Sequence, residues 1–336
     1  MYSKNMLILT GAGFGTNIGL PLENDVMKIG LKLCKENKPE LIDGIKSSWN
    51  LIDPNTSFTK YSFEELLTKI VFAEQYTTYN KSKELEIHHL KLAIFEVLVQ
   101  ALKKPLKKEI PRIYIEFIKL YKDKAHFVTL NYDYLIELIL MSEKIPWNYG
   151  YNFDEINISS FHNNHYMKRE SADFPTVFKY LKLHGSFNWH FCWKCGLLRL
   201  SDFKYFGTSG EIFSKTDRFS QVCMRCMNES GQPVMQPLII PPSAIKYYNT
   251  PIFLELWYEF EKLIKEIEKL IIIGCSIRDD DTFLIYILNN LSIKNPRLKK
   301  IVVINPDEKV DIKIENITKH SVIRYNKLED YILMHD

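Results

Sequence analysis

The sequence predicts an α/β fold with a smaller second part, and three observations indicate this arrangement. Short apolar runs, each followed by a helical pattern, occur toward both ends of the chain, which is typical of strands that alternate with helices. A long helical region interrupts them, and four of the six cysteines form two Cys-x-x-Cys pairs. The predicted strands are Met6 to Thr10, His126 to Leu130, the run that ends at His184, Lys269 to Ile273, and Lys300 to Ile304.

Length and composition indicate a folded protein. A chain of 336 residues with 46% hydrophobic and 25% charged residues can bury a sizeable core, as one large domain or two unequal ones. Lys+Arg 44 against Asp+Glu 41 leaves a net charge of +3, which gives no electrostatic footprint for nucleic acid, so we expect no direct binding to it. No apolar run reaches the roughly 18 residues of a membrane span, and the first is too short for a secretion signal. We therefore expect a cytoplasmic protein without membrane contact.

A glycine-rich turn follows the first predicted strand. The strand enters Gly11-Ala-Gly13-Phe-Gly15-Thr16-Asn17-Ile-Gly19, and a helix is predicted from Leu22 to Cys34. Strand, glycine turn and helix form the dinucleotide-binding arrangement, because glycines let the backbone approach a pyrophosphate and the helix N-terminus offers free amide groups. Thr16 occupies the place of the third fingerprint glycine, so an ordinary turn remains an alternative.

Polar residues follow three of the later strands. Asn131 and Asp133 come after the second predicted strand, Gly274 and Ser276 follow Ile273, and Asn305 follows Ile304. The carboxyl ends of strands are where α/β sheets place ligands. Helix capping by Asn131 or Asp133, and ordinary turns at the other positions, remain alternatives. The run of three aspartates at 279–281 is expected to cap the next helix and to offset its dipole.

The two cysteine pairs are the strongest single motif. Cys192, Cys195, Cys223 and Cys226 supply four thiolates in two knuckles, which suits a closed, structural, tetrahedral zinc site. His190 lies close enough to compete as a ligand, and we prefer the all-cysteine set. His184 ends a strand just before this module; alone, a structural histidine would be the better interpretation.

In this order, the motifs resemble the sirtuin family, and more closely its bacterial sirtuin-like NADase branch associated with antiphage defence. The matching stretches are Gly11-Ala-Gly13, Gly19-Leu-Pro21, Thr129-Leu-Asn131-Tyr-Asp133, His184-Gly185, the two cysteine pairs, Gly274-Cys-Ser276 and Ile304-Asn305. The resemblance implies a doubly wound, mostly parallel Rossmann-like sheet that holds NAD, with a smaller domain of zinc ribbon plus helical insertion. The implied NAD-binding domain comprises residues 1–38, 123–188 and 232–336, the helical insertion 39–122, and the zinc-ribbon module 189–231.

The resemblance also implies roles for individual residues. His184 would be the general base, and Asn131 the second catalytic residue, orienting a water. Asn131 and Asp133 would border nicotinamide and its ribose. The remaining implied NAD contacts are Gly11, Ala12 and Gly13 at the phosphates, Ser276 and Asn305 on the adenosine side, and Gly274.

Departures from protein-deacylating sirtuins shift the expected chemistry. The Asp-Phe-Arg element that follows their glycine loop is replaced by Leu22-Glu23-Asn24, their Gln before the catalytic Asn is Leu130, and their peptide-binding segment looks replaced by Leu238-Ile-Ile-Pro-Pro242. We therefore expect an NAD+ glycohydrolase that depletes NAD as a defence effector. An NAD-dependent protein-lysine deacylase and a non-catalytic NAD or ADP-ribose sensor are the alternatives.

Such a hydrolase is expected to stay inactive until it is triggered. Once the catalytic core is counted, 336 residues leave no room for a separate sensing domain. The sequence therefore leads us to expect activation by assembly, either as a homo-oligomer or with a separately encoded partner such as a HerA-like ATPase, which accompanies some relatives.

Overall fold

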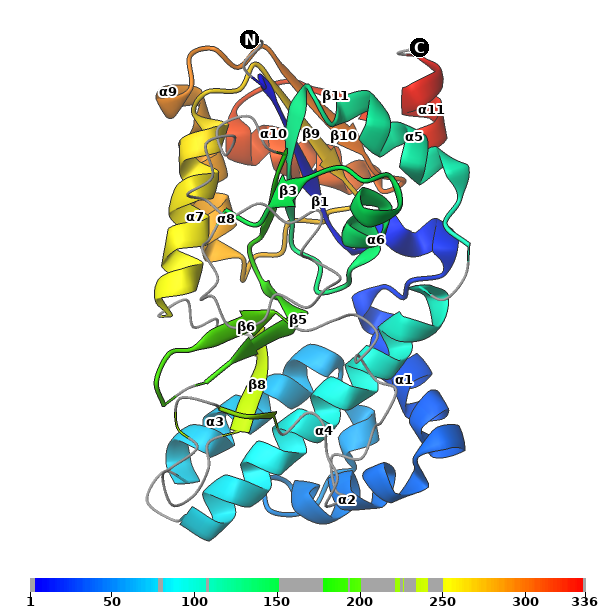
Figure 1. Cartoon of the computed structure of the whole chain (residues 1–336), viewed down its shortest axis with the longest axis vertical. Helices are drawn as coiled ribbons and strands as arrows, with labels where there is room; N and C mark the ends of the chain where they lie inside the picture. Colours follow the sequence, from blue (N-terminus) through cyan, green and yellow to red (C-terminus); the bar gives the residue numbers. More distant parts are fainter. Residues whose placement is uncertain are drawn as a thin grey trace.

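The computed structural model describes residues 4–77, 81–106, 109–150, 178–192, 194–200, 221–223, 226, 234–240 and 250–334. A large sheet with flanking helices forms one half of the molecule, a group of helices forms the other, and a small sheet lies between them (Figure 1). None of the helices within the described residues is long and apolar enough to cross a membrane.

The large sheet has seven strands in the order β11-β10-β9-β1-β2-β4-β3, and all its strand pairs are parallel. The chain starts at the central β1 and forms β2, then β3 at the edge and β4 between β2 and β3. It then adds β9, β10 and β11 on the other side of β1. This is the doubly wound, Rossmann-like arrangement that the sequence predicted. The strands are β1 (Met6–Thr10), β2 (Ala125–Thr129), β3 (Trp147–Asn148), β4 (Phe178–Lys182), β9 (Lys269–Ile273), β10 (Lys300–Ile304) and β11 (Val322–Tyr325).

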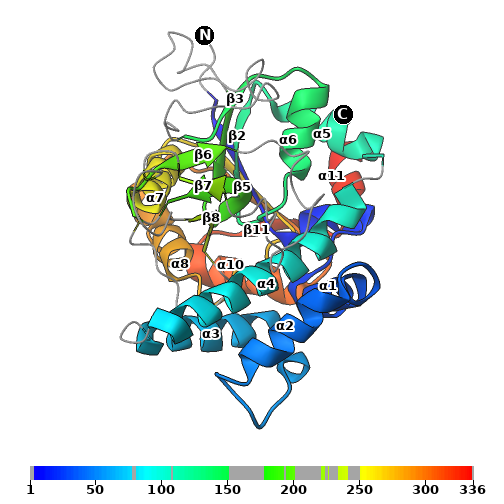
Figure 2. The same ribbon diagram turned by 60° about the horizontal axis from the view of Figure 1, so that its bottom comes forward.

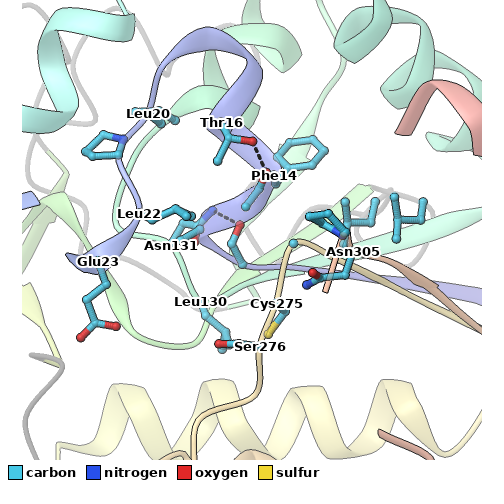
Figure 3. A pocket seen from close by; sticks show the side chains of 18 of the residues that line it. Phe14, Thr16, Leu20, Leu22, Glu23, Leu130, Asn131, Cys275, Ser276 and Asn305 are labelled. Carbon is cyan, nitrogen blue, oxygen red and sulfur yellow. Dashed lines mark hydrogen bonds between the residues drawn. The ribbon is translucent and has the colours of Figure 1, made fainter. Parts of the chain in front are cut away.

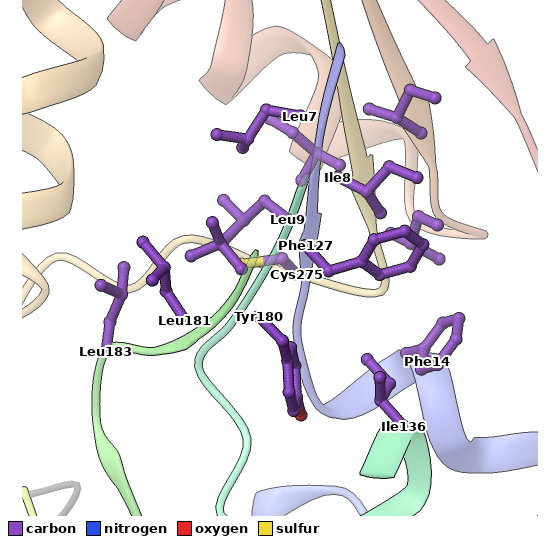
Figure 4. Packing of buried hydrophobic residues seen from close by; sticks show 14 of the residues in the cluster. Leu7, Ile8, Leu9, Phe14, Phe127, Ile136, Tyr180, Leu181, Leu183 and Cys275 are labelled. Atoms are coloured by element: carbon purple, nitrogen blue, oxygen red, sulfur yellow. The ribbon is translucent and has the colours of Figure 1, made fainter. Parts of the chain in front are cut away.

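Helices lie on both sides of this sheet, with α5 and α6 on one side and α7 and α8 on the other (Figure 1). Strands covered on both faces need continuous apolar sequence, and Leu7, Ile8 and Leu9 of β1 are each fully buried (Figure 4). These helices are α5 (Arg112–Tyr121), α6 (Leu135–Ser142), α7 (Pro251–Ile264), α8 (Thr282–Asn289), α9 (Leu291–Lys294), α10 (Glu308–Thr318) and α11 (Leu328–Leu333).

A second hydrophobic core holds the helical group together. It joins residues of α1 (Glu23–Asn37), α2 (Pro39–Trp49), α3 (Phe63–Thr77) and α4 (Lys81–Leu106). Because α1 shares this core, the boundary predicted after residue 38 falls inside a packed group of helices. α5, which the sequence also placed in the helical insertion, instead contributes Phe117 and Ile118 to the core of the large sheet. In Figure 2 this group comes forward below the small sheet.

The small sheet is antiparallel, with the order β6-β5-β8-β7. β5 starts directly after β4, with Leu183 and His184 as the turn between them, so His184 lies at the junction of the two sheets. Gly185 makes this junction possible, because its φ is +80° and a Cβ there would lie 2.1 Å from the carbonyl oxygen of Leu238. The strands are β5 (Gly185–Phe191), β6 (Leu198–Leu200), β7 (Gln221–Val222) and β8 (Val234–Ile239).

Candidate functional site

A cavity of about 1180 Å³ opens at the carboxyl ends of the central strands, beside the switch point at β1 (Figure 3). Its volume slightly exceeds the usual range of small-molecule sites, about 300–1,000 Å³. This cavity is lined by every residue that the resemblance implied as an NAD contact or a catalytic residue. They are Gly11, Ala12, Gly13, Asn131, Asp133, His184, Gly274, Ser276 and Asn305.

The floor of the cavity is a contact between two backbone segments, the loop after β1 and the loop after β9. Gly13 N donates a hydrogen bond to Gly274 O over 2.9 Å, and Gly11 N donates to Ile273 O over 2.9 Å. A Cβ on Gly13 would lie 2.7 Å from Gly274 Cα, and one on Gly274, at φ +59°, would lie 2.4 Å from Gly13 C. These glycines are therefore required for loop-to-loop packing, and the amide groups of Gly11 and Gly13 are already used.

The glycine loop does not enter α1 directly. Residues Ala12–Ile18 form a 3-10 helix, η1, which ends at Gly19 in the left-handed conformation, with φ 87°. Thr16, in the place of the third fingerprint glycine, donates its hydroxyl hydrogen bond to Gly13 O over 2.9 Å (Figure 3). Thr16 thus stabilises η1, and α1 begins only at Glu23.

Asn131 is held by the glycine loop. Its Nδ2 donates to the carbonyl oxygen of Gly11 over 2.9 Å (Figure 3), and its backbone N donates to Thr129 Oγ1 over 3.1 Å. A carbonyl partner requires the amide nitrogen of Asn131 on that side, so the side-chain oxygen is the atom left to accept a hydrogen bond. Asn131 is therefore oriented, rather than merely present, at the cavity wall.

Asp133 both caps a helix and lines the cavity. Its Oδ1 accepts a hydrogen bond from Leu135 N at the start of α6 over 2.9 Å, which is the capping role that the sequence left open. Burial raises the pKa of this carboxyl, and the nearby charge of Lys182 opposes the rise.

A buried ion pair lies beneath this loop, and the sequence analysis did not foresee it. Lys182 on β4 and Glu137 on α6 are fully buried, with Nζ and Oε1 2.9 Å apart, and Lys182 also donates to the carbonyl oxygen of Asp133. Tyr149 donates its hydroxyl hydrogen bond to Glu137 over 3.2 Å. A buried charge needs such partners, so the loop after β2 is fastened to β4 two residues before His184.

His184 is buried between aromatic rings. Its ring centroid lies 6.4 Å from that of Tyr132 and 6.4 Å from that of Trp257, and its backbone oxygen accepts a hydrogen bond from Ile240 N. Its Nε2 atom lies 3.2 Å from Oδ1 of Asp281, although the N–H bond is not aligned with that oxygen as a hydrogen bond requires. Contrary to the capping role predicted for it, the Asp281 side chain makes no capping hydrogen bond to α8.

Arg278 connects the two halves of the molecule at the mouth of the cavity. Its guanidinium contacts Glu23 at the start of α1, Glu64 on α3, and Asp280, for which Nε and Oδ1 are 2.8 Å apart. Burial raises the pKa of Glu23, and the charge of Arg278 opposes this. Sequence reasoning missed this contact because Glu64 and Arg278 are 214 positions apart and no local pattern links them.

The far end of the cavity is built from the loops after β9, β10 and β11. Asn305 Oδ1 accepts a hydrogen bond from Asp307 N over 3.0 Å, and Asn305 N donates to Tyr325 O over 3.0 Å. Residues following β11, including Lys327 and Glu329, complete this end. The sequence did not predict these residues, because β11 before them is a short, partly exposed strand.

The four predicted metal ligands lie together. Their sulfur atoms are all within 4.8 Å of one another, and those of Cys195 and Cys223 are 3.4 Å apart, too far for a disulfide bond. Zn–S bonds of about 2.3 Å place the sulfurs of a tetrahedral site about 3.8 Å apart, so the cluster fits zinc. Among the described residues, His190 does not join this cluster.

A model of one protein family matches more than half of the chain. The family described as "SIR2-like domain" matches residues 125–326. No curated protein sequence matches the chain. Similar solved structures include Sir2 bound to acetylated peptide, with 14% identity over 98% of this chain and 90% of that chain and a TM-score of 0.45. Sir2Tm bound to a propionylated peptide has 14% identity over 98% of this chain and 92% of that chain, with a TM-score of 0.44. A Sir2 homolog–NAD complex has 12% identity over 97% of this chain and 86% of that chain, with a TM-score of 0.44.

The contact between the glycine loops generates a stability prediction. Gly274→Ala should lower the free energy of unfolding by about 2–5 kcal/mol, because it adds left-handed strain and a clash with the backbone of Gly13. Urea unfolding measures this value. Gly196→Ala is the matched control, since Gly196 has φ +74° with nothing within 4 Å of its Cβ position; it should lose only about 1 kcal/mol. Equal losses in the two variants would contradict the packing explanation.

The cysteine cluster predicts one zinc ion per chain. Cys195→Ala should lose the metal, because three thiolates bind zinc far more weakly than four, and the melting temperature should fall with it. Elemental analysis of the purified protein measures the zinc content. Cys34→Ala, in the separate core of the helical group, is the control and should keep its zinc. Stoichiometric zinc in the Cys195 variant would argue against the site.

Proposed function

Because the chain belongs to the SIR2-like domain family, we propose that it is an NAD+ glycohydrolase that releases nicotinamide and ADP-ribose. One observation carries the proposal. Asn131, after β2, and His184, after β4, line the same cavity from neighbouring parallel strands. They stand beside glycine loops whose backbone contact forms the cavity floor, at the carboxyl ends of strands where α/β sheets place ligands.

The reaction needs an oriented water and a base. When the bond between C1′ of the ribose and the nicotinamide nitrogen breaks, its electron pair stays with nicotinamide and leaves an oxocarbenium-like centre. A water forms the new bond to C1′, the side-chain oxygen of Asn131 accepts a hydrogen bond from it, and His184 takes its proton. An imidazole suits this task because it titrates near neutral pH.

The mouth of the cavity supports water rather than acyl-lysine as the acceptor. Glu23 stands in the segment that replaces the Asp-Phe-Arg element of protein-deacylating sirtuins, and it is engaged by Arg278. Leu130 replaces the Gln of those enzymes before Asn131. The other replaced segment includes Pro241 and Pro242, which lie outside the described residues.

One observation favours protein-lysine deacylation as a second candidate. Beyond the polar residues, the cavity continues along an apolar wall from the helical group, formed by Phe63, Leu98 and Leu102. Such a wall could accept an acyl chain. A deacylase would release nicotinamide faster with an acetyl-lysine peptide and would form acetylated ADP-ribose, whereas an NAD or ADP-ribose sensor would bind without turnover.

We further propose that the protein is an antiphage effector that depletes NAD when activated by assembly. The proposal rests on the resemblance of its motifs to the defence-associated sirtuin-like branch. The assembly would be a homo-oligomer or a complex with a separately encoded partner such as a HerA-like ATPase.

Replacement of the two central residues tests the hydrolase. His184→Ala and Asn131→Ala should each lower NAD turnover by about 10²-fold or more, because each removes a group that acts on the attacking water. Nicotinamide release by the purified protein is the measurement, with circular dichroism to confirm folding. His320→Ala and Asn290→Ala, which lie outside the cavity, control for the residue type. Undiminished hydrolysis in both cavity variants would refute the assignment.

Activation by assembly predicts a concentration dependence. Turnover per chain should rise with protein concentration, or on addition of the partner, because the active state is favoured by mass action. Analytical ultracentrifugation and NAD cleavage measured on the same samples check this. A monomer with full activity at low concentration would contradict it.

A further inference from the structure

We propose that Asp281 is the positioning residue of His184, which fixes the imidazole so that Nε2 carries the proton and Nδ1 acts as the base. The expected effect of Asp281 on the reaction rate rests on the proposed hydrolase function. The pairing itself is a property of the fold and can be tested without substrate.

The first support is geometric. Oδ1 of Asp281 lies 3.2 Å from Nε2 of His184, and both side chains are almost entirely buried, with 3% and 7% of their surfaces exposed. Nε2 itself is shut off from solvent and makes no aligned hydrogen bond within the described residues. A buried polar nitrogen is costly without a partner, so a small rotation of the ring that aligns the N–H with this carboxylate is favoured.

The second support is that the three successive aspartates at 279–281 point in different directions and have different partners. Asp279 turns outward and pairs with Lys313 over 2.6 Å, and Asp280 pairs with Arg278 over 2.8 Å. Asp281 occupies the N-cap position of α8, where an aspartate ordinarily accepts a backbone hydrogen bond, yet its side chain makes no such bond. It turns toward the cavity and His184 instead.

The surroundings strengthen the pairing. Tyr132 and Trp257 flank the imidazole, and the Tyr132 hydroxyl donates to Ile240 O over 2.6 Å. Among the described residues, Asp281 is the carboxylate within 4 Å of the imidazole. Aromatic walls exclude water, and Coulomb interactions are stronger in such a medium.

The chemical consequence concerns one proton. A neutral imidazole has one N–H donor and one lone pair, so an Nε2–H that faces Asp281 leaves the lone pair on Nδ1. The proton of the attacking water passes to Nδ1, and the resulting imidazolium stands beside the Asp281 carboxylate, which stabilises it. Asp281 acts through His184 and does not contact the reacting atoms.

Nuclear magnetic resonance of the substrate-free full chain, with ¹⁵N-labelled histidine, tests the tautomer. The His184 signal, assigned by its loss in His184→Gln, should show a protonated Nε2 and an unprotonated Nδ1 at a pH where the ring is neutral. Asp281→Asn should change this pattern, whereas the matched control Asp279→Asn should not. A protonated Nδ1 in the unaltered protein, or an unchanged pattern in Asp281→Asn, overturns the proposal.

Kinetics of NAD cleavage form the second measurement. Asp281→Asn should lower kcat by about 10-fold or more while KM for NAD stays within about twofold, because an interaction that grows in the transition state is lost. Asp281→Glu should recover part of the rate, and Asp279→Asn should keep it. Unchanged kcat in Asp281→Asn overturns the proposal. If the protein cleaves no NAD, the proposed hydrolase function is wrong. The tautomer measurement still tests the contact between His184 and Asp281.

Discussion

The backbone contact between the loops after β1 and β9 is the constraint on which the rest of the site depends. Gly13 and Gly274 touch without intervening side chains, so the carboxyl ends of two neighbouring strands close into one floor. Asn131 is then fastened to that floor through Gly11, and the cavity residues after β9 take their places from the same loop. A side chain at either glycine would separate all these groups at once.

The position of His184 follows from the way the two sheets join. Its backbone continues from the parallel sheet into the antiparallel one, and the buried pair Lys182–Glu137 anchors the strand just before the turn. The cysteine cluster lies at the other end of β5. A structural metal held by the four cysteines would stabilise the small sheet without touching the cavity.

Local sequence patterns were enough to predict five of the seven strands of the large sheet, the cysteine cluster and the cavity residues at strand ends, because each depends on short apolar runs or fixed spacings. β11 was missed because it is a partly exposed edge strand without a continuous apolar run. The contact of His184 with Asp281 and that of Arg278 with Glu64 depend on strand order and on how the helical group packs, so no local pattern reports them. The three aspartates looked alike in sequence and differ only in direction.

Arg278 links the helical group to the large sheet by ion pairs. Its guanidinium ties α3 of the helical group to the loop of β9, three residues before Asp281. Arg278 is therefore one path by which a displacement of the helical group would reach the cavity wall, beside the packing of Phe187 and Ile239 into the core of that group. The Arg278 side chain is charged and partly buried, and it belongs to the loop that carries Asp281, so a movement of α3 would bear on the contact between Asp281 and the imidazole.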